Sequence, residues 1–186
     1  KNPGDFCLWK FKKEGEPFWP SELGDGRPGW HIEDTAITET EFGPQYDIHG
    51  GAVDLIFPHH EAEIAQMESV SGLSPLAQIW LHTGMLLVDG EKMSKSLGNF
   101  ITIRDFLKEN SVQVLRYMVL SAHYRTGLDF GKRTIAMAKA SLDRINDFKS
   151  RLQSVTGQAS HFPWEDFAKT FWNELADDFN TPKAMA

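Results

Sequence analysis

The feature that most constrains the fold is a change in how apolar residues are spaced along the chain. In the first half, glycine and proline are frequent and the apolar runs are short, as at residues 55–57 and 85–88. Over residues 132–154 apolar side chains instead recur at steps of three and four, which is typical of a long amphipathic helix. Strands mixed with helices, followed by helices alone, predict an α/β domain and then the start of a helical bundle.

Local signals place the individual elements. Gly72 is expected to end a helix, Asp89 with Gly90 to form a tight turn, and Thr102 and Ser111 each to cap a helix. Either Asn180 or Thr181 is expected to cap a last short helix. The predicted elements are loops with short extended pieces at 1–30, strand-like runs at 46–49, 55–57, 79–81 and 85–88, helices at 58–71, 132–154 and 164–176, and a loop at 156–163.

Composition excludes several classes of protein. Of the 186 residues, 41% are hydrophobic and 24% charged, which indicates a globular chain rather than a disordered one. No apolar run approaches the roughly 20 residues that cross a bilayer, so we expect no membrane partner. Cys7 is the single cysteine, which rules out an intramolecular disulfide and fits a cytoplasmic location. The net charge of −7 argues against a general nucleic-acid coat protein but allows a local basic groove.

The run Lys92-Met93-Ser94-Lys95-Ser96 carries the strongest chemical signal. Two lysines three positions apart, separated by small residues, suit a loop that neutralises a polyphosphate. Their charges would matter most where negative charge shifts onto a leaving pyrophosphate. The alternative is a solvated basic turn that follows a hairpin.

A glycine pair follows the first predicted strand. Gly50 and Gly51, directly after His49, would let the backbone approach a ligand closely. Asp54 could then accept hydrogen bonds from ribose hydroxyls. The alternative is a simple glycine turn with Asp54 as a cap.

The segment after Pro58 has a spacing that suits a metal. At 3.6 residues per turn, His59 and Glu63 share a helix face, whereas His60 and Glu61 are expected to point elsewhere. An imidazole and a carboxylate on one face can both bind zinc. The alternative is a helix N-terminus whose acidic residues favour the dipole.

A fourth segment, at residues 30–34, combines a large aromatic with a histidine and acids. Trp30, beside His31, Glu33 and Asp34, suits the wall of a pocket. The alternative is a buried tryptophan at a strand end with the acids exposed.

The lysine motif is the KMSKS signature of the class I aminoacyl-tRNA synthetases, and the chain closely resembles the cysteinyl-tRNA synthetase family. The resemblance runs in family order along almost the whole chain. It covers residues 2–10, 26–33, 46–51, 57–66, 80–84, 92–100, 116–117, 123–125 and 178–182.

The resemblance implies both a fold and a reaction. Residues 1–110 would be the second half of a Rossmann-like class I catalytic domain, and residues 111–186 the start of an α-helical bundle. The family activates cysteine with ATP, with Mg²⁺ expected, and esterifies the product to tRNA(Cys), while a zinc ion binds the substrate thiolate. The resemblance leaves the oligomeric state, monomer or higher, open.

The resemblance also assigns roles by position. Lys92 and Lys95 would be the catalytic lysines, with Lys95 contacting ATP. The adenosine and ribose site would comprise His49, Gly50, Gly51 and Asp54. His59 and Glu63 would bind zinc, and Trp30 would line the cysteine pocket.

Two departures from the family qualify these roles. Asp34 stands where the family has a zinc-ligating cysteine, which makes it a candidate third ligand. The HIGH motif of the family would lie upstream of Lys1, so we expect this chain by itself to be inactive. Two other functions fit the motifs: a related ligase that joins cysteine to an amino sugar, and a stand-alone binding module without catalysis.

Overall fold

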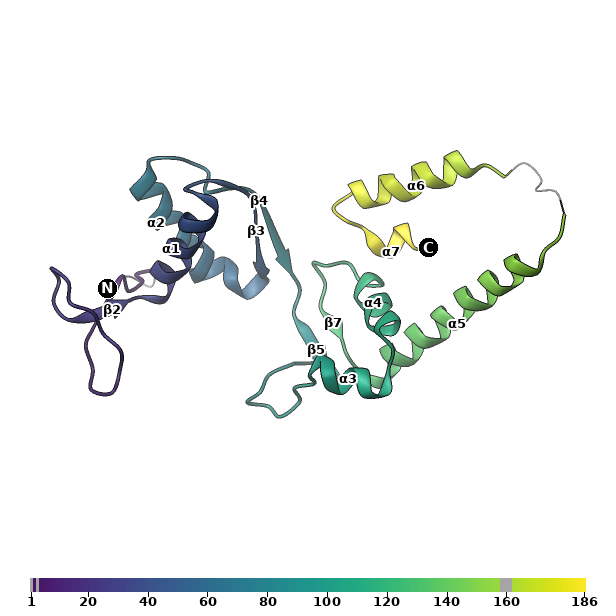
Figure 1. Cartoon of the computed structure of the whole chain (residues 1–186), viewed down its shortest axis with the longest axis horizontal. Coiled ribbons are helices and arrows are strands. Elements are labelled where there is room, and N and C mark those ends of the chain that lie inside the picture. The colour runs from purple at the N-terminus through teal and green to yellow at the C-terminus, as the bar shows by residue number, and fades with distance from the viewer. Residues whose placement is uncertain (1, 3, 158–161) are drawn as a thin grey trace. The chain divides into compact units, whose positions relative to one another are not determined.

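The computed structural model describes residues 2, 4–157 and 162–186, and it divides the chain into two compact units, Lys1–His82 and Thr83–Ala186 (Figure 1). Each unit is mixed in its secondary structure, so the expectation of an α/β chain is confirmed. Among the described residues, no helix is long and apolar enough to cross a bilayer. The predicted boundary at residue 110 falls inside the second unit and stays a prediction.

The first unit is built around two helices and a two-stranded sheet. The strands of this sheet, β3 and β4, flank the helical segment that carries most of the predicted site. The elements in chain order are β1 (Trp9–Phe11), β2 (Gly26–Pro28), α1 (Trp30–Phe42), β3 (Tyr46–Ala52), the 3-10 turn η1 (Val53–Leu55), the π-helical turn η2 (Ile56–His60), α2 (Glu61–Ser71) and β4 (Ala77–Thr83).

The core of this unit is small and lies on one face of α2. Ala62 and Met67 of α2 are buried together with Leu76 and Ala77, which lead into β4. Helix α2 ends where predicted, because Gly72 adopts a left-handed conformation with φ of 70°.

The second unit places a small sheet beside a series of helices. Strand β5 is central, antiparallel to β6 and parallel to β7. The elements are β5 (Leu86–Val88), β6 (Glu91–Lys92), α3 (Ile103–Glu109), α4 (Val112–Leu120), β7 (Leu128–Asp129), α5 (Lys132–Ser154), α6 (Trp164–Ala176) and α7 (Thr181–Ala184). Its core is a single cluster that consists of Phe106, Val114, Met118, Phe130 and Ala138.

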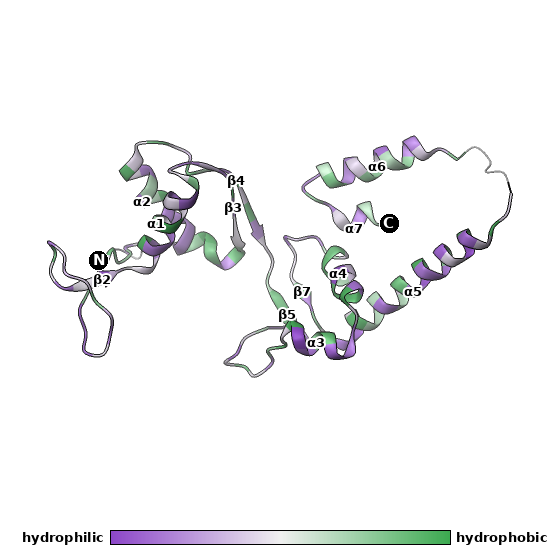
Figure 2. Ribbon diagram, in the orientation of Figure 1, coloured by the Kyte–Doolittle hydropathy of each residue, from purple (hydrophilic) through white to green (hydrophobic). Residues whose placement is uncertain are grey.

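Most predicted elements of the second unit are confirmed. Helices α5 and α6 have the predicted bounds, and apolar and polar residues alternate along α5 as its amphipathic period requires (Figure 2). Thr102 caps α3 by accepting the Asp105 backbone N–H at 3.0 Å, and Ser111 and Asn180 cap α4 and α7. The turn between β5 and β6 uses positive φ at Asp89 (52°) and Gly90 (84°). The predicted loop at 156–163 lies partly outside the described residues.

One alternative and one expectation for the first unit are wrong. The alternative for residues 30–34, a buried tryptophan at a strand end, fails because these residues begin helix α1 and Trp30 is 58% exposed. The run at 55–57 is not a strand, since it belongs to the turns η1 and η2. Only Phe57 retains extended dihedral angles there, with φ −133° and ψ 133°.

Candidate functional site

The first unit contains a hollow of about 330 Å³ between α1, β3 and the turn that leads into α2. Its lining combines apolar side chains with imidazole and carboxylate groups. The lining residues are Trp30, Asp34, Ile37, Thr38, His49, Gly50, Leu55, His59, His60 and Glu63.

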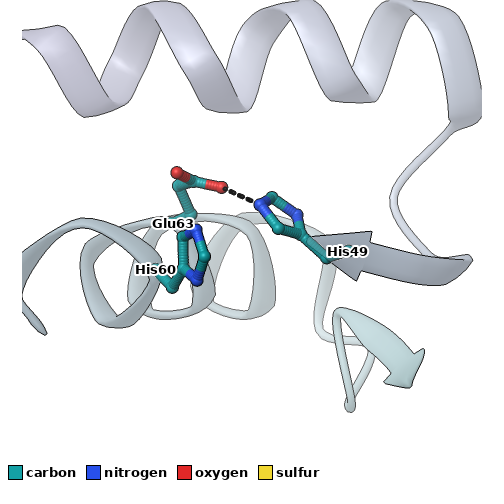
Figure 3. A group of neighbouring side chains, drawn as sticks. All are labelled: His49, His60 and Glu63. Atoms are coloured by element: carbon teal, nitrogen blue, oxygen red, sulfur yellow. Dashed lines mark ion pairs between the residues drawn. The ribbon is translucent and has the colours of Figure 1, made fainter. Parts of the chain in front are cut away.

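Three of these side chains form a compact group. One potential ligand atom from each of His49, His60 and Glu63 lies within 4.8 Å of the others. Figure 3 shows His49, from β3, facing Glu63 and His60 on the neighbouring helical segment. The Nε2 atom of His49 lies 3.4 Å from Oε2 of Glu63. Two nitrogens and one carboxylate oxygen at this spacing are a donor set that suits zinc.

The local backbone explains why His60 joins this group. His60 ends the π-helical turn and Glu63 lies in the first turn of α2, so the two are three positions apart on adjoining helical residues. Gly51 permits the approach, because a Cβ atom at this position would lie only 2.8 Å from Cε1 of His60. A side chain at residue 51 would therefore displace the imidazole.

Burial sets the charge of the group. Burial, followed by the nearby negative charge of Asp34, raises the pKa of Glu63 to about 7. Burial, followed by the neighbouring His49, His82 and His59, lowers the pKa of His60 to about 4. Burial also lowers the pKa of His49, so both imidazoles are neutral at neutral pH, the form that binds metal. The contact between His49 and Glu63 is consequently not a full ion pair at pH 7.

Partners outside the hollow orient the two imidazoles. The hydroxyl of Tyr46 lies 2.6 Å from Nδ1 of His49, and Nε2 of His82 lies 2.8 Å from Nδ1 of His60. Trp80 stacks on His49 with ring centroids 4.7 Å apart. These contacts engage Nδ1 of each ring, as is usual for metal-binding histidines, and Nε2 of His49 faces Glu63.

A metal ion would also provide a partner for a buried carboxylate oxygen that has no hydrogen bond among the described residues. Oε2 of Glu63 is buried, and no hydrogen bond within the described part of the chain satisfies it. A buried acceptor without a partner is costly, and a cation would supply that partner. The residues present therefore fit a zinc ion.

The predicted zinc pair is only partly brought together. His59 and Glu63 both line the hollow, but Nδ1 of His59 lies 3.0 Å from Nε2 of His31 instead of joining the compact group. The expectation that His60 points elsewhere is wrong, because His60 and Glu63 are three positions apart on adjoining helical residues and therefore share a face. Asp34, on α1, lines the same hollow.

The remaining predicted residues of the first unit lie around the hollow or beside it. Trp30 lines it and meets the ring of His59 edge-on, with centroids 4.8 Å apart. His49 and Gly50 line it as well. Gly51 lies against His60, and Asp54, on η1, is outside the lining.

The predicted lysines belong to the second unit. Lys92 ends β6, where its backbone pairs with Leu87, and Lys95 lies in the loop between β6 and α3. The Nζ atom of Lys95 lies 5.7 Å from the ring centroid of Phe100. The loop is exposed at Lys95, as a group that meets a polyphosphate requires.

Sequence reasoning missed four side chains around the imidazoles: His60, His82, Tyr46 and Trp80. One signal was present, because the three-residue spacing of His60 and Glu63 also places side chains together on a helix. No local signal identifies the other three. His82 and Trp80 come from β4, and Tyr46 lies three positions from His49 on β3, a spacing that the two-residue period of a strand does not place on one face.

Comparison with known proteins identifies the class of this α/β chain as a tRNA synthetase catalytic domain of class I. Residues 1–140 match the family model for the tRNA synthetases class I (C) catalytic domain. The chain therefore belongs to that family.

Curated relatives agree with this assignment. The chain is 60% identical over 160 residues to a cysteine–tRNA ligase of Thermoplasma volcanium, with 86% of this chain and 35% of the relative aligned. It is 49% identical over its whole length to a cysteine–tRNA ligase of Legionella pneumophila, of which it covers 40%. The chain thus spans well under half the length of these relatives.

Solved structures support the fold alone. The LeuRS of Agrobacterium radiobacter K84, in a ternary complex with tRNA and LeuAMS, aligns with a TM-score of 0.57 at 14% identity, covering 94% of this chain and 27% of that one. The methionyl-tRNA synthetase of Mycobacterium tuberculosis aligns with a TM-score of 0.52 at 18% identity. The alignment covers 79% of this chain and 32% of that one.

Proposed function

We propose that the protein containing this chain activates cysteine with ATP and transfers it to tRNA(Cys) in the cytoplasm. The observation that carries the proposal is the hollow with its imidazole and carboxylate group, in a chain that aligns over its whole length with a cysteine–tRNA ligase. Cysteine can offer a zinc ion a thiolate, a soft anionic ligand that the neutral hydroxyl of serine does not match.

We assign the hollow to zinc and to the side chain of cysteine. Glu63 belongs both to the pair predicted from sequence and to the compact group, so it is the ligand on which the two agree. His59 and Asp34 complete the predicted set, and His49 and His60 offer the nearest nitrogens. A bound zinc would favour a thiolate over a neutral hydroxyl and so select cysteine over serine. Trp30 would form one wall of the pocket.

We assign the lysine loop to ATP. Lys92 and Lys95 would neutralise the polyphosphate together with Mg²⁺, and their charges would act mainly as pyrophosphate leaves. His49, Gly50, Gly51 and Asp54 would serve the adenosine and ribose end, where the two glycines let the backbone come close.

Cysteine-dependent ATP–pyrophosphate exchange by the full-length protein tests the activation step. We expect Lys95→Ala to lower the rate of exchange by about 10²–10³, the scale for losing one positioned charge or donor. ATP affinity should change less, because the charge acts on the transition state. Lys149→Ala, at an exposed position of α5, is the matched control and should leave exchange unchanged.

Three results would contradict the assignment. Near-normal exchange with much weaker ATP binding in Lys95→Ala would show that the lysine serves ground-state binding only. Charging of an amino sugar instead of tRNA by the wild-type protein would favour the related cysteine ligase, and absence of exchange would favour a binding module.

A further inference from the structure

The loop between β6 and α3 is fixed at both of its ends by the core of the second unit. Before the loop, Met93 packs against the core cluster and its backbone N–H donates to the carbonyl of Leu86 at 2.9 Å. After the loop, Ile101 packs against the same cluster, and Thr102 caps α3. Residues 94–100 therefore form a closed excursion from a packed base, with Lys95 at the start of its turn.

One side chain joins the two arms of this excursion. The Oδ1 atom of Asn99 accepts the backbone N–H of Ser94 at 2.9 Å, and its Nδ2 group donates to the carbonyl of Lys92 at 3.1 Å. An amide can accept from one backbone group and donate to another at a fixed separation, and here Asn99, on the second arm, does both toward the first arm. Asn99 thus takes the place of a strand partner where the β5–β6 pairing has ended.

The turn inside the excursion depends on this closure. The N–H of Gly98 donates to the carbonyl of Lys95 at 3.2 Å, and Gly98 has φ of 69°, a conformation that favours glycine. The hydroxyl of Ser94 accepts the N–H of Leu97 at 3.3 Å. Because Ser94 is held by Asn99, the direction in which Lys95 leaves the backbone is set by the amide of residue 99.

We propose that Asn99 is a positioning residue for the lysine loop, which acts on the polyphosphate through Lys95 without contacting the substrate itself. The effect on catalysis through Lys95 rests on the proposed function. The closure of the loop by Asn99 rests on the hydrogen bonds alone. A flexible lysine that must meet a transferring group within a narrow geometry gains rate when its backbone is fixed beforehand.

The structural part is tested by amide hydrogen exchange in the full-length protein. In Asn99→Ala the N–H of Ser94 loses its acceptor, and we expect its exchange to accelerate by about tenfold or more. The N–H of Phe106, which bonds to the carbonyl of Thr102 at the base, should keep its rate and so report an intact fold. An unchanged rate at Ser94 would overturn the proposal.

A second variant protects this test against misfolding. Asn99→Asp keeps the acceptor for Ser94 and loses the donor to the carbonyl of Lys92, so Ser94 should stay protected in it. Asn173→Ala, at an exposed position of α6, is the matched asparagine control and should alter neither rate. Loss of protection in Asn99→Asp equal to that of Asn99→Ala would also overturn the proposal.

The catalytic part is tested by ATP–pyrophosphate exchange in a double-mutant cycle with Lys95→Ala. We expect Asn99→Ala to lower kcat roughly 5- to 100-fold, the combined worth of two hydrogen bonds, with KM for ATP nearly unchanged. In the Lys95→Ala background the same change should cost less than about twofold, because the group it positions is gone. Equal losses of kcat in both backgrounds would show that Asn99 does not act through Lys95 and would overturn the catalytic part. A wild-type protein without ATP–pyrophosphate exchange would refute the proposed function, and the hydrogen-exchange result would still test the structural part.

Discussion

Replacing Glu63 by glutamine should stabilise the metal-free first unit at pH 8. The Glu63 side chain is buried, with 5% of the residue exposed, and its Oε2 atom has no hydrogen-bond partner within the described residues. Burial and the charge of Asp34 raise the pKa of Glu63 to about 7, so the folded chain holds this proton more tightly than the unfolded chain. Glutamine has a similar shape and carries no charge, which removes the cost of a buried carboxylate.

The size and sign of the effect follow from the two pKa values. The carboxyl titrates near 4.5 when unfolded and near 7 when folded, and each pKa unit is worth about 1.36 kcal/mol, which sets an upper bound of about 3 kcal/mol. Between about pH 4.5 and pH 7 the native state binds more protons than the unfolded state. The free energy of unfolding of the wild type therefore falls as the pH rises through this range. The advantage of Glu63→Gln should be absent below about pH 4.5 and complete above about pH 7.

Urea unfolding at pH 4, 5.5 and 8 in the presence of a chelator measures this difference. Trp80, which stacks on His49, provides a fluorescent reporter close to the substitution. Glu61→Gln is the matched control, because Glu61 is exposed on the same helix, and it should not give the stabilisation expected of Glu63→Gln at pH 8. A difference between Glu63→Gln and wild type that is constant across pH would refute the reasoning.

Zinc should reverse the order of stability. A ligand that binds only the folded state stabilises it by about 2.7 kcal/mol at a hundred times its Kd. The wild type should gain this stabilisation at pH 8, whereas Glu63→Gln, lacking the charged ligand, should gain much less. Equal stabilisation of both proteins would exclude Glu63 as a ligand.

Two further predictions concern packing. Met118→Ala should lower the free energy of unfolding, measured in urea, by about 2–5 kcal/mol, because Met118 has no exposed surface. Met137→Ala is the control and should cost less than about 0.5 kcal/mol, because Met137 is 61% exposed. Similar losses in the two variants would refute this prediction. Gly51→Ala should cost about 1–3 kcal/mol by overpacking, because its Cβ would lie 2.8 Å from the His60 ring. Gly50→Ala is its control, with the nearest atom at an ordinary 3.6 Å, and equal losses in the same urea assay would contradict the argument.

The parts of the fold that the sequence predicts are those whose cause is local. The period of residues 132–154 and the caps Thr102 and Ser111 each act within one or two helical turns, and all three are confirmed. The Asp89-Gly90 turn is likewise set by two residues that tolerate positive φ.

Helix α1 could not be predicted in this way. None of its residues is buried, and three threonines, which are poor helix formers, lie in its length. Their hydroxyls instead donate to carbonyls of the preceding turn, as from Thr40 to Ala36 at 2.7 Å. Contact with α2, including Thr35 with Gln66 at 2.9 Å, also supports the helix, and no local pattern encodes it.

In the candidate site, too, the features with a local cause could be predicted from the sequence and those that depend on distant residues could not. The lysine motif and the glycine pair were visible because each is a contiguous run. The orientation of His49 and His60 was not, because His60 depends on His82 of the distant strand β4, and Tyr46 reaches His49 along β3 at a spacing that the period of a strand does not predict. The one avoidable error was to treat the His59–Glu63 spacing as the only one that shares a helix face.

The two sites are built on opposite physical principles, and each principle suits the chemistry proposed for it. A thiolate must be recognised by a cation of fixed position, and Glu63 is accordingly held in a buried group whose uncompensated carboxylate lowers the stability of the metal-free fold. The loop proposed to meet a polyphosphate is instead exposed, and its backbone is fixed by two hydrogen bonds of Asn99, each worth about 1 kcal/mol. Stability is thus given up at the proposed zinc site, whereas the exposed lysine loop relies on a local closure that positions Lys95.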